Sequence, residues 1–117
     1  MRTVRVDQER VNKVLATMKQ SLSEGRFSFA EERAKNMATL ARLGIRWQEV
    51  KEYLEELTYH EYISGPEPDR DYPNSDKFWK FKMPIQGELV YIKLKIQYRE
   101  DKTVHVVSFH IDEILEL

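Results

Sequence analysis

The strongest constraint on the fold is the alternation in residues 90–99, VYIKLKIQYR. Successive side chains of a strand point to opposite faces, so strict alternation predicts a strand with one buried and one exposed face. One parity holds Val90, Ile92, Leu94, Ile96 and Tyr98, and the first four of these form the apolar face that we expect to be buried. The parity expected to be exposed holds Tyr91, Lys93, Lys95, Gln97 and Arg99.

Two neighbouring segments complete a predicted antiparallel sheet. Residues 77–83 (KFWKFKM) and 103–111 (TVHVVSFHI) flank a strand over 89–99, and the links 84–88 and 100–102 are short. Links of this length join antiparallel neighbours, which predicts a meander. The inward side chains should be Trp79, Phe81, Val107, Phe109 and Ile111, although Val104 and Val106 leave the parity of the last strand open.

The first half of the chain predicts helices. Apolar residues recur at helical spacing from Asp7, a possible N-cap, to a stop at Gly25. Residues 26–30 should form an extended link or a brief strand. A second helix, for which Ser28 is a possible N-cap, should follow and end at Gly44. A third should cover about 47–57. The predicted fold is α+β: one domain over 1–117, with a helical part at about 7–58 on one face of a sheet at about 77–112.

Residues 64–76, SGPEPDRDYPNSD, lie between the two parts. Three prolines and a glycine exclude a helix or a central strand and predict a loop. A loop of this length in a compact domain is often functional. A plain connection from helix to sheet is the alternative.

Charge is distributed unevenly, although the whole chain carries a net charge of only −1. Residues 60–76 hold five acidic residues and one arginine, a net charge of −4. Residues 77–110 hold seven basic and three acidic residues, a net charge of +4. The basic C-terminal part favours an anionic partner.

Composition excludes several classes of protein. The chain has no cysteine, which rules out disulfides and thiolate zinc sites. No apolar run is long enough to span a bilayer, and the N-terminus has no apolar signal core. We expect a cytoplasmic protein with no membrane partner.

If the inward side chains of the three strands are assigned correctly, the opposite side of the sheet holds several lysines. It also holds Tyr91 and His110, whose side chains can exchange protons. This basic face consists of Lys80, Lys82, Tyr91, Lys93, Lys95, Ser108 and His110. Neighbouring strands lie about 4.8 Å apart and same-face residues repeat every 6.6 Å or so, so several groups could surround one phosphodiester. His105 has the opposite parity to His110, so the two should not pair on a regular strand.

These residue types suit RNA cleavage without a metal or other cofactor. A histidine titrates near neutral pH and can exchange a proton with the ribose 2′-hydroxyl or the leaving oxygen. Lysines and a tyrosine hydroxyl can stabilise the negative charge that the phosphorane gathers. The candidate catalytic residues are therefore Lys80, Tyr91 and His110. The candidate RNA-binding residues are Lys82, Lys93, Lys95 and Arg99. A solvated sheet face is the simpler explanation of alternating lysines.

Three segments in order, LTYHEYISGPEPDRD, FWKFKMPIQGELVYIKLKI and VVSFH, resemble the MqsR family of type II toxin–antitoxin toxins. The upstream LARLGIRWQEV is also similar, and the resemblance covers residues 30–112. It implies a RelE-like fold, a sequence-preferring endoribonuclease that cleaves mRNA and arrests growth, and a cognate antitoxin. The matching site positions are Lys80, Tyr91 and His110, with Lys93 as an RNA-backbone contact.

Two positions depart from the family pattern. His110 stands where some members have lysine, and Ser64 also stands where some members have lysine. The first difference changes the group available for proton transfer, and the second removes a cation that Lys82 or Lys95 could replace.

Three functions follow as hypotheses. The first is a ribonuclease toxin that uses the basic face. The second is a module that binds RNA or an acidic protein segment without chemistry. The third is a structural partner whose sheet edge is extended by another chain's strand.

Overall fold

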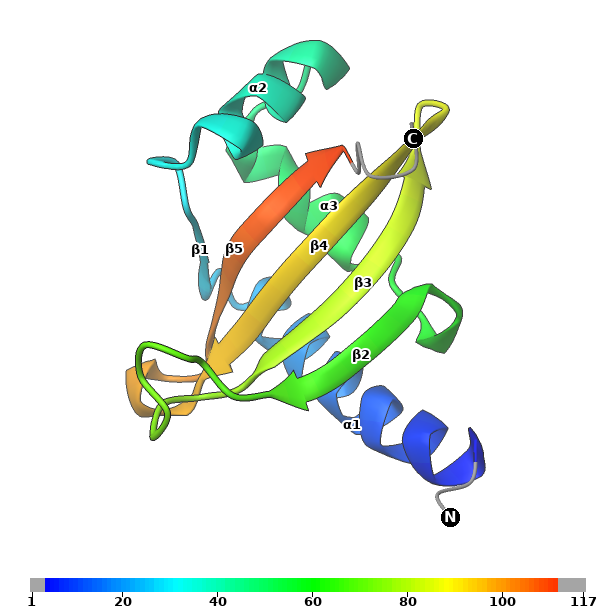
Figure 1. Cartoon of the computed structure of the whole chain (residues 1–117), viewed down its shortest axis with the longest axis vertical. Coiled ribbons are helices and arrows are strands. Elements are labelled where there is room, and N and C mark those ends of the chain that lie inside the picture. The colour runs from blue at the N-terminus through cyan, green and yellow to red at the C-terminus, as the bar shows by residue number, and fades with distance from the viewer. Residues whose placement is uncertain (1–3, 112–117) are drawn as a thin grey trace.

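A computed structural model describes residues 4–111 and confirms an α+β fold (Figure 1). The α-helices are α1 (Val4–Ser23), α2 (Ala34–Leu43) and α3 (Val50–Leu54), and the short 3₁₀ turns are η1 (Trp47–Glu49), η2 (Tyr59–Glu61) and η3 (Tyr98–Glu100). The strands are β1 (Phe27–Phe29), β2 (Tyr62–Glu67), β3 (Phe78–Ile85), β4 (Glu88–Gln97) and β5 (Thr103–Ile111). They form one sheet in the order β1-β5-β4-β3-β2.

The sheet is mixed, whereas the sequence predicted a purely antiparallel meander. Strands β2 to β5 do pair antiparallel in chain order. Strand β1, from the helical half, adds to β5 in parallel, with Phe27 opposite Val104 and Phe29 opposite Val106. This short strand settles the two readings of 26–30 in favour of a strand. It also shows why Ser28 does not cap α2, which begins only at Ala34.

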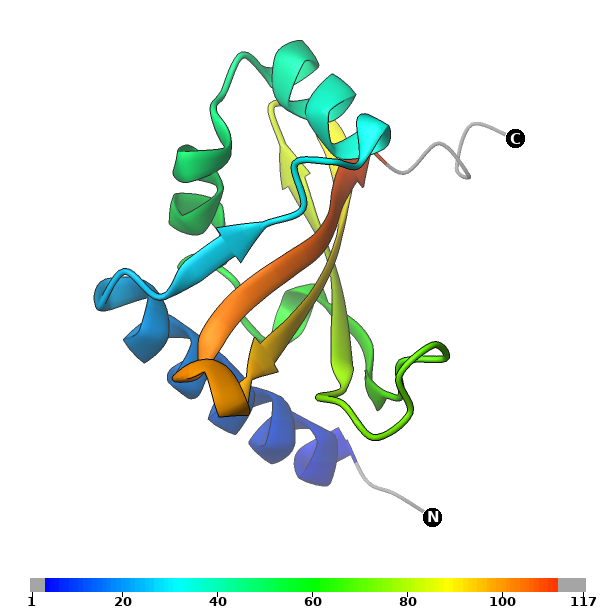
Figure 2. The same ribbon diagram turned by 90° about the vertical axis from the view of Figure 1, so that its left-hand side faces the viewer.

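The helices cover one face of the sheet. In Figure 2 the sheet is seen nearly edge-on, with α1 and α3 on one side and the loop of residues 68–77 on the other. The buried apolar side chains of α1 include Val11, Leu15, Met18 and Leu22, and those of β4 are Val90, Ile92, Leu94 and Ile96. Both sets belong to one core cluster, so the alternation in β4 predicted its buried face correctly.

Helix boundaries differ from the predictions in detail. Asp7 lies within the first turn of α1 rather than at its cap, since the helix already includes Val4. Gly44 ends α2 as predicted, with a left-handed φ of 69° that a residue without a Cβ adopts freely. The third helix is shorter than expected: η1 gives way to α3, which ends at Leu54.

The predicted loop 64–76 is partly a strand. Its first residues complete β2, which pairs with β3 through two irregularities of register. Strand β2 is the edge of the sheet, where a proline such as Pro66 is tolerated because its missing N–H need not face a neighbour. The irregular connection is therefore confined to residues 68–77.

The last strand contains a bulge that the sequence did not reveal. Lys93 pairs with Ser108 but Leu94 pairs with Val106, so Val107 is an extra residue in β5. Val104, Val106 and Phe109 all belong to the core cluster, whereas Val107 is also buried but lies outside that cluster. The prediction that Val107 points inward is therefore wrong, and Ile111 is only partly buried.

Helix α2 replaces the missing neighbour strand along the second half of β5. The Asn36 amide donates to the carbonyl oxygens of Ala30 (3.1 Å) and Val107 (3.0 Å), and its oxygen accepts from Phe109 N (2.9 Å). The Ile111 N–H donates to the Thr39 hydroxyl at 3.1 Å. These side chains satisfy the backbone groups that an unpaired edge would leave exposed.

No helix within residues 4–111 has both the length and the apolar character required to cross a bilayer.

Candidate functional site

Strand register places the predicted catalytic residues on one face. Lys80 is opposite Lys93, Lys82 is opposite Tyr91, and Tyr91 is opposite His110. Directly paired residues of antiparallel strands project to the same side, away from the buried parity of β3 and β4. The shared face is confirmed, while the chemical roles of these residues stay predictions.

The candidate RNA-binding residues divide into two groups. Lys82, Lys93 and Lys95 belong to the basic face. Arg99 does not, because β4 ends at Gln97 and Arg99 lies exposed in η3. It borders a separate hollow beside Lys95 that residues 74–76 also line.

The bulge adds a second histidine to the basic face. His105 pairs with Lys95 and therefore projects to the same side as His110, contrary to the parity expected for a regular strand. Its Nδ1 lies 2.7 Å from the Ser28 hydroxyl of β1. Burial, and then the nearby Lys95 charge, lower the pKa of His105, which favours the neutral imidazole. Sequence reasoning missed this residue because the extra residue at Val107 has no local signature.

Tyr91 and His110 form the aromatic pair of the site. Their ring centroids are 5.3 Å apart and the rings are tilted by 45°. Both side chains are partly exposed. The His110 Nδ1–H donates to the Ile111 carbonyl oxygen at 3.3 Å. A neutral imidazole that uses Nδ1 as donor has its acceptor lone pair on Nε2, so that nitrogen is able to take a proton.

Lys80 is held by a carboxylate from the edge strand. Its Nζ lies 2.9 Å from Glu67 Oε1, and the Ser64 hydroxyl donates to the other oxygen of Glu67. The hydrogen bond to Glu67 raises the pKa of Lys80, and Tyr91 contributes in the same direction. The hydrogen bonds from Lys80 and Ser64 in turn lower the pKa of Glu67. Lys80 is thus a persistent cation beside Tyr91.

The Phe78 ring lies beneath the ammonium groups of Lys93 and Lys95. Lys93 Nζ is 4.2 Å and Lys95 Nζ is 5.1 Å from the centroid of its ring. Lys95 also faces Asp69, at 3.8 Å, and both side chains are largely shielded from solvent. A cation over a ring face is favourable, so Phe78 helps to hold both ammonium groups in place.

A pocket of about 380 Å³ lies where the loop of residues 68–77 passes over the basic face. It is lined by Arg33, Glu67, Pro68, Asp69, Arg70, Asp71, Phe78, Lys80, Lys93 and Val107. The sequence shows that residues 60–76 are acidic. It does not show that these carboxylates contact the lysines, because that contact forms only in the folded protein. Arg33 gave no signal, because it precedes a helix far from the sheet in sequence.

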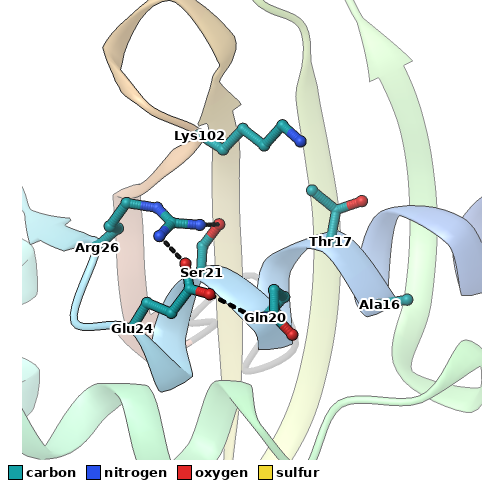
Figure 3. A pocket seen from close by; sticks show the side chains of 7 residues that line it. All are labelled: Ala16, Thr17, Gln20, Ser21, Glu24, Arg26 and Lys102. Atoms are coloured by element: carbon teal, nitrogen blue, oxygen red, sulfur yellow. Dashed lines mark hydrogen bonds and ion pairs between the residues drawn. The ribbon is translucent and has the colours of Figure 1, made fainter.

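A second pocket, of about 480 Å³, lies between α1 and the turn that joins β4 to β5 (Figure 3). Arg26 contacts Glu24 and Ser21, and Gln20 donates to the other oxygen of Glu24. The polar groups of this cluster largely satisfy one another. It holds none of the residues proposed for chemistry.

Metal ligands are not gathered in this part of the protein. Across residues 4–111, no group of three or more histidine, aspartate or glutamate side chains is arranged to hold a metal ion.

Comparisons of the chain with protein-family models, with curated protein sequences and with solved structures find no match.

Proposed function

We propose that this protein is a ribonuclease toxin of the MqsR type, which cleaves mRNA without a metal by using the ribose 2′-hydroxyl as nucleophile. The observation that carries the proposal is the register that aligns Lys80 with Lys93 and Tyr91 with His110 on one face. The resemblance of three ordered segments to the MqsR family adds support. A RelE-like fold, a cognate antitoxin and action in the cytoplasm belong to the same proposal.

In the proposed reaction His110 Nε2 takes the proton from the 2′-hydroxyl, whose oxygen then attacks the adjacent phosphorus. Lys80 and the Tyr91 hydroxyl stabilise the added negative charge on the non-bridging oxygens. The bond from phosphorus to the 5′-oxygen breaks, and this oxygen takes a proton from solvent. The products are a 2′,3′-cyclic phosphate and a free 5′-hydroxyl.

Cleavage of labelled RNA in EDTA tests the proposal. His110→Ala removes the base and Tyr91→Phe removes one hydroxyl donor, so we expect cleavage about 10²- to 10⁴-fold slower in the first variant. Tyr91→Phe should slow cleavage less than His110→Ala does, because Lys80 still stabilises the negative charge on the non-bridging oxygens. His60→Ala and Tyr53→Phe change the same residue types away from the basic face and should leave the rate unchanged. Full cleavage by His110→Ala would contradict the proposed role of the imidazole.

A non-catalytic binding module is the second candidate. One observation favours it: Lys80 is already paired with Glu67, so part of the positive charge assigned to catalysis is compensated within the protein. Such a module would retain RNA at low salt and leave it intact. Failure to retain RNA would instead favour a structural partner.

A toxin also needs restraint by its antitoxin. We expect expression of the wild-type chain alone to stop growth of the host cell, and His110→Ala to relieve this arrest. Equal growth arrest by the wild-type and His110→Ala proteins would show that toxicity does not depend on the proposed RNA cleavage.

A further inference from the structure

Lys93 differs from Lys80 and Lys95, its neighbours on the basic face. Lys80 has Glu67 at 2.9 Å and Lys95 has Asp69 at 3.8 Å. Lys93 forms no ion pair with any residue of the described segment 4–111, and its ammonium group lies over the Phe78 ring instead. Its charge is therefore the one in this row that no carboxylate neutralises directly.

The surroundings of Lys93 leave positive charge in excess there. Burial lowers the pKa of Lys93, and the neighbouring charges of Lys80 and Arg33 lower it further. Asp69 and Glu67 oppose this shift with smaller effects. An anion placed beside Lys93 would relieve the repulsion among the cations and would stabilise the protonated ammonium group.

Arg33 reaches the same pocket from the start of α2. Its side chain makes no capping hydrogen bond to the helix, although its backbone occupies the N-cap position. The side chain is exposed and lines the pocket together with Lys93, while Phe78 and Val107 supply an apolar wall. A guanidinium is suited to phosphate because its donors match two oxygens at once.

We propose that Arg33 and Lys93 form a subsite for one phosphodiester of the RNA backbone, beside the bond that Tyr91 and His110 act upon. This subsite rests on the proposed function for its place in the substrate. Three carboxylates, Glu67, Asp69 and Asp71, also line the pocket. They disfavour a dianion, so the subsite selects the singly charged diester over free phosphate.

Binding of a fluorescent 2′-O-methyl RNA tests the subsite without cleavage, because this RNA lacks the nucleophilic hydroxyl. We expect Arg33→Gln combined with Lys93→Gln to weaken binding about tenfold in fluorescence anisotropy. The dependence of log Kd on log salt should become shallower by about 0.7, the contribution of one phosphate contact to a single strand. The matched control is Arg46→Gln combined with Lys51→Gln, which removes two exposed cations from the helical layer and should bind like wild type.

The outcomes separate the subsite from the chemistry. Unchanged affinity and salt dependence in the Arg33 and Lys93 variant, with an intact thermal transition, would overturn the subsite, as would wild-type protein that does not bind this RNA. Loss of affinity for inorganic phosphate but not for RNA would also overturn it. If the variant binds RNA more weakly while the wild type fails to cleave unmodified RNA, the subsite holds and the proposed nuclease function fails.

Discussion

At the scale of single residues, local alternation predicted much of the candidate site. Lys80, Tyr91, Lys93 and His110 share a face because side-chain direction in regular strands follows from parity alone. The bulge at Val107 could not be predicted, since Val104, Val106 and Val107 are equally apolar and fit either face. For this reason His105 lies on the basic face, whereas the candidate RNA-binding residue Arg99 does not, because β4 ends before that position.

Asn36 provides a test at this scale. Its side chain makes three hydrogen bonds, two of them with backbone groups of Val107 and Phe109 that are buried beside the bulge. Asn36→Ala leaves these groups without partners, so we expect the free energy of unfolding to fall by about 2–4 kcal/mol. Urea denaturation measures the change. Asn12→Ala, at an exposed position of α1, should stay within about 0.5 kcal/mol of wild type, and an equally small effect of Asn36→Ala would contradict the role of the amide.

At the scale of elements, the order of helical and alternating segments was enough to predict the α+β arrangement. Strand β1 was harder, because three residues carry little pattern and its partner β5 lies far along the chain. The acidic segment was visible as charge, but not its place on the basic face. That place depends on Glu67 and Asp69 meeting Lys80 and Lys95 in the folded protein.

The ion pair between Glu67 of β2 and Lys80 of β3 should compete with RNA for the Lys80 ammonium group. Glu67→Gln removes the carboxylate that pairs with Lys80, so we expect 2′-O-methyl RNA to bind about two- to fivefold more tightly. The exposed Glu56→Gln makes the same charge change in the helical part and is the matched control for affinity measured by anisotropy. Weaker or unchanged binding by Glu67→Gln would show that this carboxylate does not restrain Lys80.

The same pair predicts a dependence of stability on pH. The pKa of Glu67 is lowered in the folded protein by Lys80 and Ser64, so the folded state favours the charged carboxylate. Its contribution is complete above the ordinary pKa of a glutamate and is lost as pH falls through the lowered value. Both side chains are partly exposed, which limits the contribution to below about 1 kcal/mol. Urea denaturation of wild type and Glu67→Gln should therefore differ at pH 7 and converge in acid; a constant difference would contradict this account.

At the scale of the whole molecule, the separation of basic and acidic segments matters more for RNA binding than the net charge of −1 does. Helices α1 and α3 lie on one side of the sheet and the loop of residues 68–77 lies on the other (Figure 2). Asp69 of this loop faces Lys95 of the basic face at 3.8 Å. With one phosphate bound at Lys80 and one at the subsite of Arg33 and Lys93, the slope of log Kd for RNA against log salt should be about 1.4. A slope near zero would show that the basic face does not bind the RNA backbone.

The central claim is that this face cleaves RNA through the 2′-hydroxyl. Mass spectrometry of fragments produced in EDTA tests it most directly, because the reaction leaves a characteristic end. We predict a 2′,3′-cyclic phosphate on one fragment and a free 5′-hydroxyl on the other, and formation of these fragments about 10²- to 10⁴-fold more slowly by the His110→Ala protein. Intact RNA after incubation with the wild-type protein, or fragments that carry a 5′-phosphate, would contradict the account.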